Sequence, residues 1–382
     1  MKNLLFIVPS RGNAGTNSSL SCIYNIFKDR YNIKVVTMES KGNGSYEFLK
    51  EAYTPLFLDA YLQNYSNIKG LLKFVSFLIK IIKRLAFVLG LDFETKVLCH
   101  VAKQIERQWD LDYIIGFQEG IAMKFAAQFE NPNKLTWIHC DYVRAFSESQ
   151  NELNLYARFK KIVCVSNFTR EQFVSRYPSL STRTTTIYNL LDEERILRLS
   201  CEPIEDSNFK NSVFTIISMG RMDPIKRFTL IPSIAQKIKE RNLKFNWYIL
   251  GGPKNDTYKE IEKSIQKNNV SDCVILLGNK TNPYPYLKQS DLLVATSNSE
   301  ACPMVFNEAK LCGTPIVTSN FGSAHELISE DINGYVCSIE KIEEKIIDLI
   351  ITTKYNELKK KCFLQDLNQE KIKNMIADLF TL

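Results

Sequence analysis

Short apolar runs alternate with amphipathic segments along almost the whole chain, and this alternation limits the possible folds more than any other feature. Short apolar runs are typical of buried strands, and the amphipathic segments between them are typical of helices. The strands are expected at residues 4–8, 33–36, 113–117, 135–138 and 162–165, and at 213–218, 246–250, 274–277, 292–295 and 316–317. The sequence therefore predicts an α/β protein built from doubly wound parallel sheets.

The alternation breaks once, over a polar and acidic stretch at residues 190–211 that contains Pro203. A chain of 382 residues exceeds the size at which a single hydrophobic core keeps growing. We therefore expect two Rossmann-like domains, 1–190 and 191–354, which face a central cleft and place a ligand site at the carboxyl ends of their strands. Residues 355–382 are expected to be helical and to pack on either domain.

Composition excludes several classes of protein. The net charge of +7 is modest and no nucleic-acid recognition motif is visible, so no nucleic-acid partner is expected. The ten cysteines stand singly, without the spacing of a zinc site, which predicts reduced thiols in a cytoplasmic protein. The apolar run near Met1 is too short for a signal peptide. No uncharged apolar stretch of about 20 residues occurs, so no membrane-spanning helix is expected.

The clearest basic cluster lies at residues 68–89. Its basic side chains recur at helical intervals and fall within about 100° of arc, while most of the remaining arc is Leu, Ile, Phe and Val. They are Lys69, Lys73, Lys80, Lys83 and Arg84. Such a helix can pack in the core with its lysines in solvent, or it can lie in the interface of an anionic membrane with its lysines toward the headgroups. The sequence leaves both interpretations open.

The end of the strand at 213–218 carries residues suited to a diphosphate. Gly220 allows a tight turn, and Arg221 and Lys226 then place two cations beside the start of the next helix. Standing alone, the two side chains would be ordinary surface charges. Other strand ends of the second half strengthen the interpretation as an anion site.

The strand at 292–295 is followed by a loop and a helix with clear boundaries. Pro303 suits the first helical position and Gly313 the C-terminal stop, so Glu300 should lie in the loop before the helix. Residues 318–327 open a further helix, whose free backbone N–H groups can also face an anion.

One carboxylate is expected within the apolar face of the helix that starts near Pro303. Met304, Val305, Ala309 and Cys312 mark that buried face, and Glu308 falls inside the same arc. An ionised carboxylate there is costly unless strong hydrogen-bond donors meet it. Vicinal hydroxyls of a sugar or a ribose are one such donor set, and a buried arginine is the structural alternative.

Together these segments resemble the retaining glycosyltransferases of family 4, which have the GT-B fold, and in particular the bacterial members that build surface polysaccharide. The resemblance rests on the G-R-x-D-x-x-K-R-F segment at 220–228, on the pair Glu300 and Glu308 spaced E-x₇-E, and on the Gly-Thr-Pro-Ile-Val-Thr strand that follows. Their order covers nearly all of residues 213–336. The resemblance therefore implies a GT-B fold with a donor site in the C-terminal domain.

The resemblance also implies roles for individual side chains. The donor-binding residues would be Arg221, Lys226, Glu300, Met304, Val305 and Glu308. The two cations would hold the diphosphate, Glu308 the ribose hydroxyls, and Glu300 hydroxyls of the transferred sugar. Ala301 departs from the glycine that is usual in the family. Because no D-x-D segment that would obviously hold a metal is present, neither a metal ion nor a cofactor beyond the nucleotide-sugar is expected.

The first half resembles the family more loosely, through Gly-Phe-Gln-Glu-Gly at 116–120 and Trp-Ile-His-Cys-Asp-Tyr at 137–142. His139 ends a strand in a chain with only three histidines, so we assign it a catalytic contact to the donor sugar rather than the structural role that most histidines have. The remaining candidates are Asn13, Glu119 and Asp141 for the acceptor and Gly15 for the donor. The domain at 1–190 is thus expected to bind the acceptor.

The implied reaction moves a hexose or N-acetylhexosamine from a UDP-sugar to a hydroxyl of a growing surface polysaccharide, such as capsule or O-antigen, with retention of configuration. The acceptor would be a polyprenyl-diphosphate-linked saccharide. The enzyme would be cytoplasmic and peripheral at the inner face of the cell membrane, and would dock through the helix at 68–89. A nucleotide-sugar epimerase of GT-B fold and a catalytically silent accessory subunit remain as alternatives.

Overall fold

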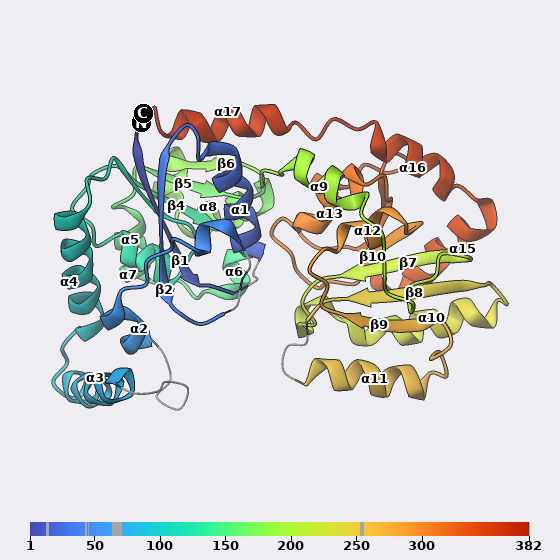
Figure 1. The fold of residues 1–382 in the computed structure, drawn as a ribbon, viewed down its shortest axis with the longest axis horizontal. Coiled ribbons are helices and arrows are strands. Elements are labelled where there is room, and N and C mark those ends of the chain that lie inside the picture. The colour runs from blue at the N-terminus through green and yellow to red at the C-terminus, as the bar shows by residue number, and fades with distance from the viewer. Residues whose placement is uncertain (13–14, 43, 45, 63–70, 253–255, 382) are drawn as a thin grey trace. The chain divides into compact units, whose positions relative to one another are not determined.

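The computed structural model describes residues 1–382 apart from 13–14, 43, 45, 63–70, 253–255 and 382. Contacts divide the chain into two compact units, Met1–Leu190 with Glu370–Leu382, and Leu191–Gln369. Each unit contains a parallel six-stranded sheet with helices packed on it (Figure 1). The α/β class that the apolar runs predict is therefore confirmed.

The sheet of the N-terminal unit has the strand order β2-β1-β3-β4-β5-β6, with all neighbours parallel. Five of these strands were expected from apolar runs. The edge strand β6 was not, because its three threonines form no apolar run. The strands are β1 Asn3–Ser10, β2 Asn32–Glu39, β3 Tyr113–Gly116, β4 Lys134–Ile138, β5 Lys161–Cys164 and β6 Thr184–Thr186.

The main core of the N-terminal unit lies between this sheet and helices α4, α5 and α8. Phe125 of α5 and Phe173 of α8 are fully buried there, against Ile114 and Ile162 of the strands. The α-helices are α1 Gly15–Phe27, α2 Leu56–Leu62, α3 Leu71–Val88, α4 Phe93–Gln108, α5 Ile121–Ala126, α6 Tyr142–Ala145, α7 Gln150–Tyr156 and α8 Asn167–Arg176, and the 3₁₀ helices are η1 Glu47–Leu49 and η3 Pro178–Arg183.

The sheet of the C-terminal unit has the order β12-β11-β10-β7-β8-β9, and all pairs are again parallel. The edge strand β12 was not among the expected strands, and it begins with a glycine and ends with a cysteine. The strands are β7 Phe214–Met219, β8 Phe245–Leu250, β9 Val274–Gly278, β10 Leu292–Ala295, β11 Ile316–Ser319 and β12 Gly334–Cys337.

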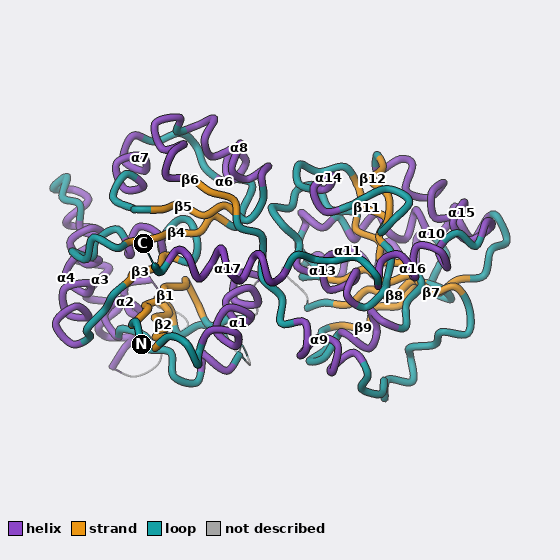
Figure 2. Tube along the Cα trace, turned by 90° about the horizontal axis from the view of Figure 1, so that it is seen from above, coloured by secondary structure: helices purple, strands orange, loops and turns teal. Residues whose placement is uncertain are grey.

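Helices pack on this second sheet, and Figure 2 shows its strands (orange) among helices (purple). The core gathers around Trp247 of β8 and includes Ile238 of α10, Ile261 of α11 and Ile346 of α15. The α-helices are α9 Glu193–Ser200, α10 Ile231–Glu240, α11 Thr257–Lys267, α12 Tyr284–Lys288, α13 Met304–Leu311, α14 Ala324–Leu327, α15 Ile342–Thr352 and α16 Tyr355–Phe363, and the 3₁₀ helices are η4 Pro224–Lys226, η5 Phe228–Leu230 and η6 Ile339–Lys341.

The polar and acidic stretch at residues 190–211 contains the helix α9. The Asp192 carboxylate caps it by accepting from the N–H of Arg195 at 3.2 Å. Glu193 and Glu194 stand in its first turn, where the helix dipole favours negative charge, and Ile196 is buried. Three of the acidic residues of this stretch, Asp192, Glu193 and Glu194, are therefore the start of a helix.

The last two helices of the chain belong to different units. Leu358 of α16 lies in the core of the C-terminal unit, whereas α17 (Gln369–Leu379) belongs, after its first residue, to the N-terminal unit. Phe380 is buried, and its ring centroid lies 5.4 Å from that of Tyr31 and 5.5 Å from that of Tyr113. Residues 355–382 are thus divided between the two units and do not pack as one segment.

Two glycines bring the carboxyl ends of β7 and β8 together. Gly220 has φ = +147° and Gly251 has φ = +152°, conformations that L side chains rarely adopt. A Cβ built on Gly251 would lie 1.8 Å from the carbonyl oxygen of Gly220. The loop that begins at Gly220 can therefore lie directly against the end of β8.

This contact makes a stability prediction. Gly251→Ala should destabilise the C-terminal unit by about 2 kcal/mol or more, because the backbone must shift to admit the methyl group. A loss of this size lowers the melting temperature by about 5 °C. Gly252→Ala is the matched control, because a Cβ there meets nothing within 4 Å. Equal melting temperatures for the two variants would contradict the close approach of Gly251 to Gly220.

Candidate functional site

Arg221 and Lys226, the two cations expected after β7, stand before and at the end of a short 3₁₀ helix, η4. The Asp223 carboxylate caps η4 by accepting from the N–H of Ile225 at 3.2 Å, and Pro224 occupies the first position of that helix. The next helix is thus this single turn, which Arg221 precedes and which Lys226 ends. Lys226 is half-buried, whereas Arg221 is exposed.

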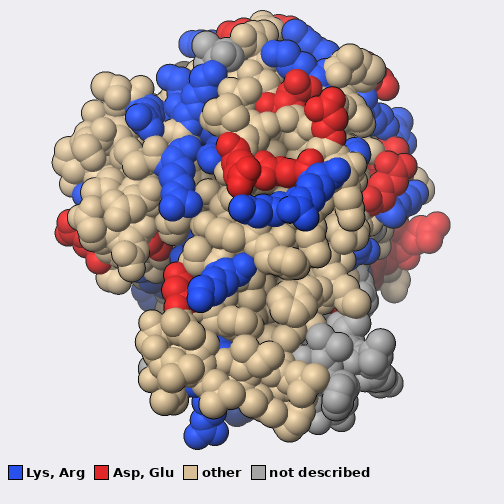
Figure 3. All heavy atoms as spheres, turned by 90° about the vertical axis from the view of Figure 1, so that its left-hand side faces the viewer, with Lys and Arg blue, Asp and Glu red and all other residues tan. Residues whose placement is uncertain are grey.

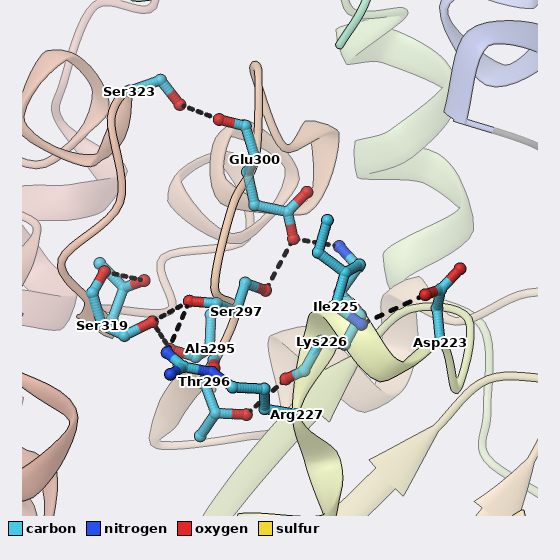
Figure 4. A network of polar contacts seen from close by, with 11 residues as sticks. Asp223, Ile225, Lys226, Arg227, Ala295, Thr296, Ser297, Glu300, Ser319 and Ser323 are labelled. Atoms are coloured by element: carbon cyan, nitrogen blue, oxygen red, sulfur yellow. Dashed lines mark hydrogen bonds and ion pairs between the residues drawn. The ribbon is translucent and has the colours of Figure 1, made fainter. Parts of the chain in front are cut away.

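Lys226 forms an ion pair with Glu300 (Figure 4). The ammonium donates to Glu300 Oε1, and Ser297 Oγ donates to the same oxygen at 2.7 Å. The two charged side chains keep only 19% and 16% of their surface exposed. Two residues assigned to the donor site by the sequence therefore meet directly, and one Glu300 oxygen has two donors.

Arg227 was not singled out from the sequence, yet it fixes the loop that carries Glu300. Its backbone is left-handed, with φ = 51°, and its guanidinium reaches the loop after β10. Nε donates to the carbonyl oxygen of Thr296 at 2.8 Å, and Nη2 donates to that of Ser297 at 3.0 Å. Arg227 thus links the loop after β7 to the loop after β10.

Two serines hold the same loop from the other side. Ser323 Oγ donates to the carbonyl oxygen of Glu300 at 3.0 Å, and Ser319 Oγ donates to that of Ser297. In Figure 4 these contacts and the Lys226 ion pair converge on one short loop. We call the set the Glu300 network: Lys226, Arg227, Ser297, Glu300, Ser319 and Ser323. No sequence signal distinguishes these serines from the other polar residues near Glu300.

Glu308 of α13 lies buried, as its place in the apolar arc predicts, and is 8% exposed. Burial raises the pKa of Glu308 to about 7, against a hydrogen bond from Tyr284 and the positive charge of Arg195, both of which lower it. Arg195 itself is exposed. The partner found for Glu308 is therefore a tyrosine hydroxyl of α12, which the sequence did not indicate.

The single buried face expected for α13 is wrong. Met304 and Val305 are half-buried at its start, whereas Phe306, Asn307 and Lys310 are buried. The reason is that α13 packs against α9, α12 and α16, so most of its circumference is covered. Burial lowers the pKa of Lys310 to about 8, and its ammonium donates to a backbone carbonyl.

In the N-terminal unit, His139 follows β4 and its ring packs on Phe117, with centroids 4.9 Å apart. Its Nε2 is buried and finds no hydrogen-bond partner among the residues that the structure describes. Burial lowers the pKa of His139 to about 3. The imidazole is therefore neutral near pH 7 and holds an unused hydrogen-bonding atom.

Glu119 and Asp141 both make local contacts. Glu119 Oε2 accepts from the N–H of His139 at 2.7 Å, so this buried carboxylate joins the loops after β3 and β4. Burial raises the pKa of Glu119. Asp141 caps α6 by accepting from the N–H of Arg144 at 3.4 Å. The acceptor-binding roles assigned to the two carboxylates stay predictions.

The glycine-rich turn after β1 is described in part. Gly15 begins α1, is exposed and has open space around its Cα. Asn13, the remaining acceptor candidate, lies outside the described residues. Among the described residues, no group of three or more His, Cys, Asp or Glu side chains is arranged to bind a metal ion.

Comparison with known proteins links the C-terminal site to a family. Residues 202–363 match the family described as glycosyl transferases group 1, and this region contains Arg221, Lys226, Glu300 and Glu308. The C-terminal unit is therefore similar to this family over these residues.

Two relatives illustrate the similarity. The chain is 26% identical to an uncharacterised glycosyltransferase of Methanocaldococcus jannaschii over 267 residues. This match covers 65% of the chain and 63% of the relative. Over 188 residues it is 28% identical to the N-acetylgalactosamine-N,N′-diacetylbacillosaminyl-diphospho-undecaprenol 4-alpha-N-acetylgalactosaminyltransferase of Campylobacter jejuni, covering 49% of this chain and 48% of that enzyme. These matches span about half to two thirds of the relatives' own lengths.

Among solved structures, Anabaena HepE in complex with UDP and glucose has a TM-score of 0.74 to this chain, at 19% identity and over 100% of both chains. At this identity the likeness shows the fold. The two doubly wound units are those of the GT-B fold, which confirms the predicted fold.

The two hydrogen bonds that Arg227 donates to the loop after β10 should protect the amides of this loop from hydrogen exchange. Arg227→Gly keeps the left-handed backbone accessible but removes both hydrogen bonds to the loop, so the amides of residues 296–300 should exchange at least about tenfold faster. Arg221→Ala, at an exposed neighbour, is the control and should leave their exchange unchanged. Unchanged exchange in Arg227→Gly would show that these two hydrogen bonds do not hold the Glu300 loop.

Proposed function

We propose that the protein is a retaining glycosyltransferase that moves a hexose or N-acetylhexosamine from a UDP-sugar to a hydroxyl of a growing, lipid-linked surface polysaccharide. The observation that carries the proposal is the ion pair between Lys226 and Glu300. The buried Glu308 belongs to the same unit, and all three residues lie within residues 202–363, which match the family. The HepE complex with UDP supports the nucleotide, and the Campylobacter relative, named for a diphospho-undecaprenol acceptor, supports the lipid carrier.

In the proposed donor complex the Lys226 ammonium exchanges one anionic partner for another. A diphosphate competes with Glu300 for this cation, because charge-assisted hydrogen bonds to phosphate oxygens are strong. The Glu300 carboxylate remains held by Ser297 and can then accept hydrogen bonds from hydroxyls of the transferred sugar. Arg221 is exposed and supplies a second cation to the diphosphate.

The nucleoside end of the donor is assigned to α13 and its surroundings. Glu308 accepts hydrogen bonds from the two vicinal ribose hydroxyls, which favour its charged form and so lower its raised pKa. Met304 and Val305 are half-buried at the start of α13 and provide apolar contacts to the donor. Gly15 at the start of α1 is assigned to the donor phosphates.

The proposed reaction displaces the nucleoside diphosphate from the anomeric carbon. The bond from that carbon to the phosphate oxygen breaks, the acceptor oxygen attacks from the same face, and its proton passes to the leaving diphosphate. Lys226 and Arg221 stabilise the negative charge that develops there. His139 is neutral near pH 7, so it acts as a hydrogen-bond partner of the donor sugar and not as an acid.

The reaction itself is tested with a panel of UDP- and GDP-sugars, with and without a polyprenyl-diphosphate-linked saccharide. We expect UDP release that depends on the acceptor, and a product whose new linkage keeps the anomeric configuration of the donor. A product of inverted configuration contradicts retention. Interconversion of the sugar without UDP release identifies an epimerase, and a melting temperature that no nucleotide shifts identifies a silent scaffold.

Substitution of Lys226 tests the role of the ammonium. Lys226→Ala should lower kcat/KM for transfer by about 100- to 1,000-fold, because a charge aimed at the leaving group is lost. Lys263→Ala, at an exposed lysine of α11, is the control and should keep the wild-type value. A decrease of less than threefold in Lys226→Ala would remove this residue from the donor site.

The raised pKa of Glu308 predicts a pH dependence of donor binding. Because the ribose hydroxyls favour the ionised carboxylate, affinity for a UDP-sugar should be highest above pH 7 and weaken by about tenfold per unit below it. Binding at pH 6 should release about one proton, measured by titration calorimetry in buffers of different ionisation enthalpy. A UDP-sugar is used in place of UDP, because the terminal phosphate of UDP itself titrates near pH 6 and would add to the proton release.

Glu308→Gln provides the control for this dependence. The amide keeps the size of the side chain but cannot ionise, so the variant should bind the UDP-sugar more weakly and with no proton release between pH 6 and 8. Equal proton release by the variant and the wild type would assign the titration to another group.

A further inference from the structure

Helix α3 leaves a wide apolar face exposed. Six of its large apolar side chains keep between 42% and 76% of their surface in contact with solvent, and they are Phe77, Leu78, Ile81, Ile82, Leu85 and Val88. At 100° per residue these positions fall within about 140° of arc. A contiguous apolar face of this kind on a water-soluble surface marks a binding site for another apolar surface.

Among the described side chains of α3, a narrow seam on the opposite side joins the core. Ile79 and Ala86 are buried, and Ile79 packs with Tyr61 of α2 and Val97 of α4. The sequence left open whether the apolar arc of this helix is buried in the core. The described side chains of the arc are exposed and not buried in the core, which favours a role in binding.

Basic side chains border the exposed apolar face. Lys80 and Arg84 lie on the flank between the buried seam and the apolar face, and they are exposed together with Lys83. No acidic residue occurs between Asp59 and Asp92 in the sequence. Figure 3 shows the lowest part of its view, where α3 lies, as mainly uncharged atoms with some blue and without red. Residues 60–91 therefore combine apolar area with positive charge alone.

An anionic bilayer matches both properties of this surface. Apolar side chains can enter the boundary between headgroups and acyl chains while the flanking cations meet lipid phosphates. A second copy of the helix would bring two basic flanks together with no acidic side chain on the helix to offset them. Among the described residues, no helix has the length and apolar character to cross a membrane, so the fit is to a helix lying in the interface.

We propose that α3 is a membrane-docking surface that lies in the plane of an anionic bilayer. Phe77, Ile81, Leu85 and Val88 enter the acyl boundary, and Lys80 and Arg84 contact the headgroup phosphates. This inference rests on the proposed function in that it brings the N-terminal unit to a lipid-linked acceptor. Binding to vesicles is measured without donor or acceptor, so failure of the docking surface and failure of the transfer activity are distinguishable.

Vesicle flotation of the full chain tests the proposal. The wild type should float with vesicles that contain about 30% phosphatidylglycerol in phosphatidylcholine, and only weakly with pure phosphatidylcholine. Lys80→Glu, Lys83→Glu and Arg84→Glu together should weaken binding to the anionic vesicles by about 100-fold or more. Ile81→Ser, Leu85→Ser and Val88→Ser together should abolish it even at low salt, where charge attraction is strongest.

A matched control carries the same charge change on another exposed helix. Lys259→Glu, Lys263→Glu and Lys267→Glu on α11 should leave vesicle binding unchanged, because these lysines border no exposed apolar face. UDP-sugar affinity and the melting temperature should be unchanged in all three triple variants, which shows that they are folded. Failure of the wild type to float, or equal flotation of the wild type and the α3 variants, overturns the proposal. The proposal is also overturned if the wild type does not bind vesicles but forms a dimer that the serine variant cannot form. That outcome would assign the surface to a protein partner.

Discussion

The ion pair between Lys226 and Glu300 is the interaction on which the proposed donor site depends. It joins the loop after β7 to the loop after β10, and the hydroxyls of Ser297 and Ser323 with the guanidinium of Arg227 hold the same loop in place. A buried charge is tolerated only when another charge or strong donors meet it. Each partner therefore holds the other in position, and in the proposed donor complex a diphosphate replaces the carboxylate at the cation.

The two glutamates of the site stand in different environments and are suited to different tasks. Glu300 is half-buried and meets an ammonium and a hydroxyl. Glu308 is buried on α13 with a tyrosine hydroxyl as partner, and its pKa is raised to about 7. A carboxylate in that position gains most when a ligand brings further hydroxyl donors, so in the proposed donor complex the cost of its burial would contribute to selectivity for a ribose.

Much of the fold follows from apolar runs, because buried parallel strands need them. The edge strands β6 and β12 were missed, whereas the edge strands β2 and β9 were found. β6 is three threonines, and β12 is a four-residue strand that begins with a glycine. The burial of Glu308 was expected from a single apolar arc, although α13 is in fact covered on most of its circumference, whereas nothing in the sequence indicated the role of Arg227. Its contacts join residues far apart in sequence and depend on a left-handed backbone that no residue type at that position indicates. Exposure of the apolar face of α3 likewise depends on how few neighbours cover it, which periodicity does not determine.

The most direct test of the donor site is a crystal structure of the protein with a bound UDP-sugar. The account predicts that the Glu308 carboxylate lies within hydrogen-bond distance of both ribose hydroxyls, and that the Lys226 ammonium contacts a phosphate oxygen in place of Glu300. A complex in which the nucleotide leaves Glu308 without a ribose contact, or in which Lys226 stays paired with Glu300 and meets no phosphate, would contradict it.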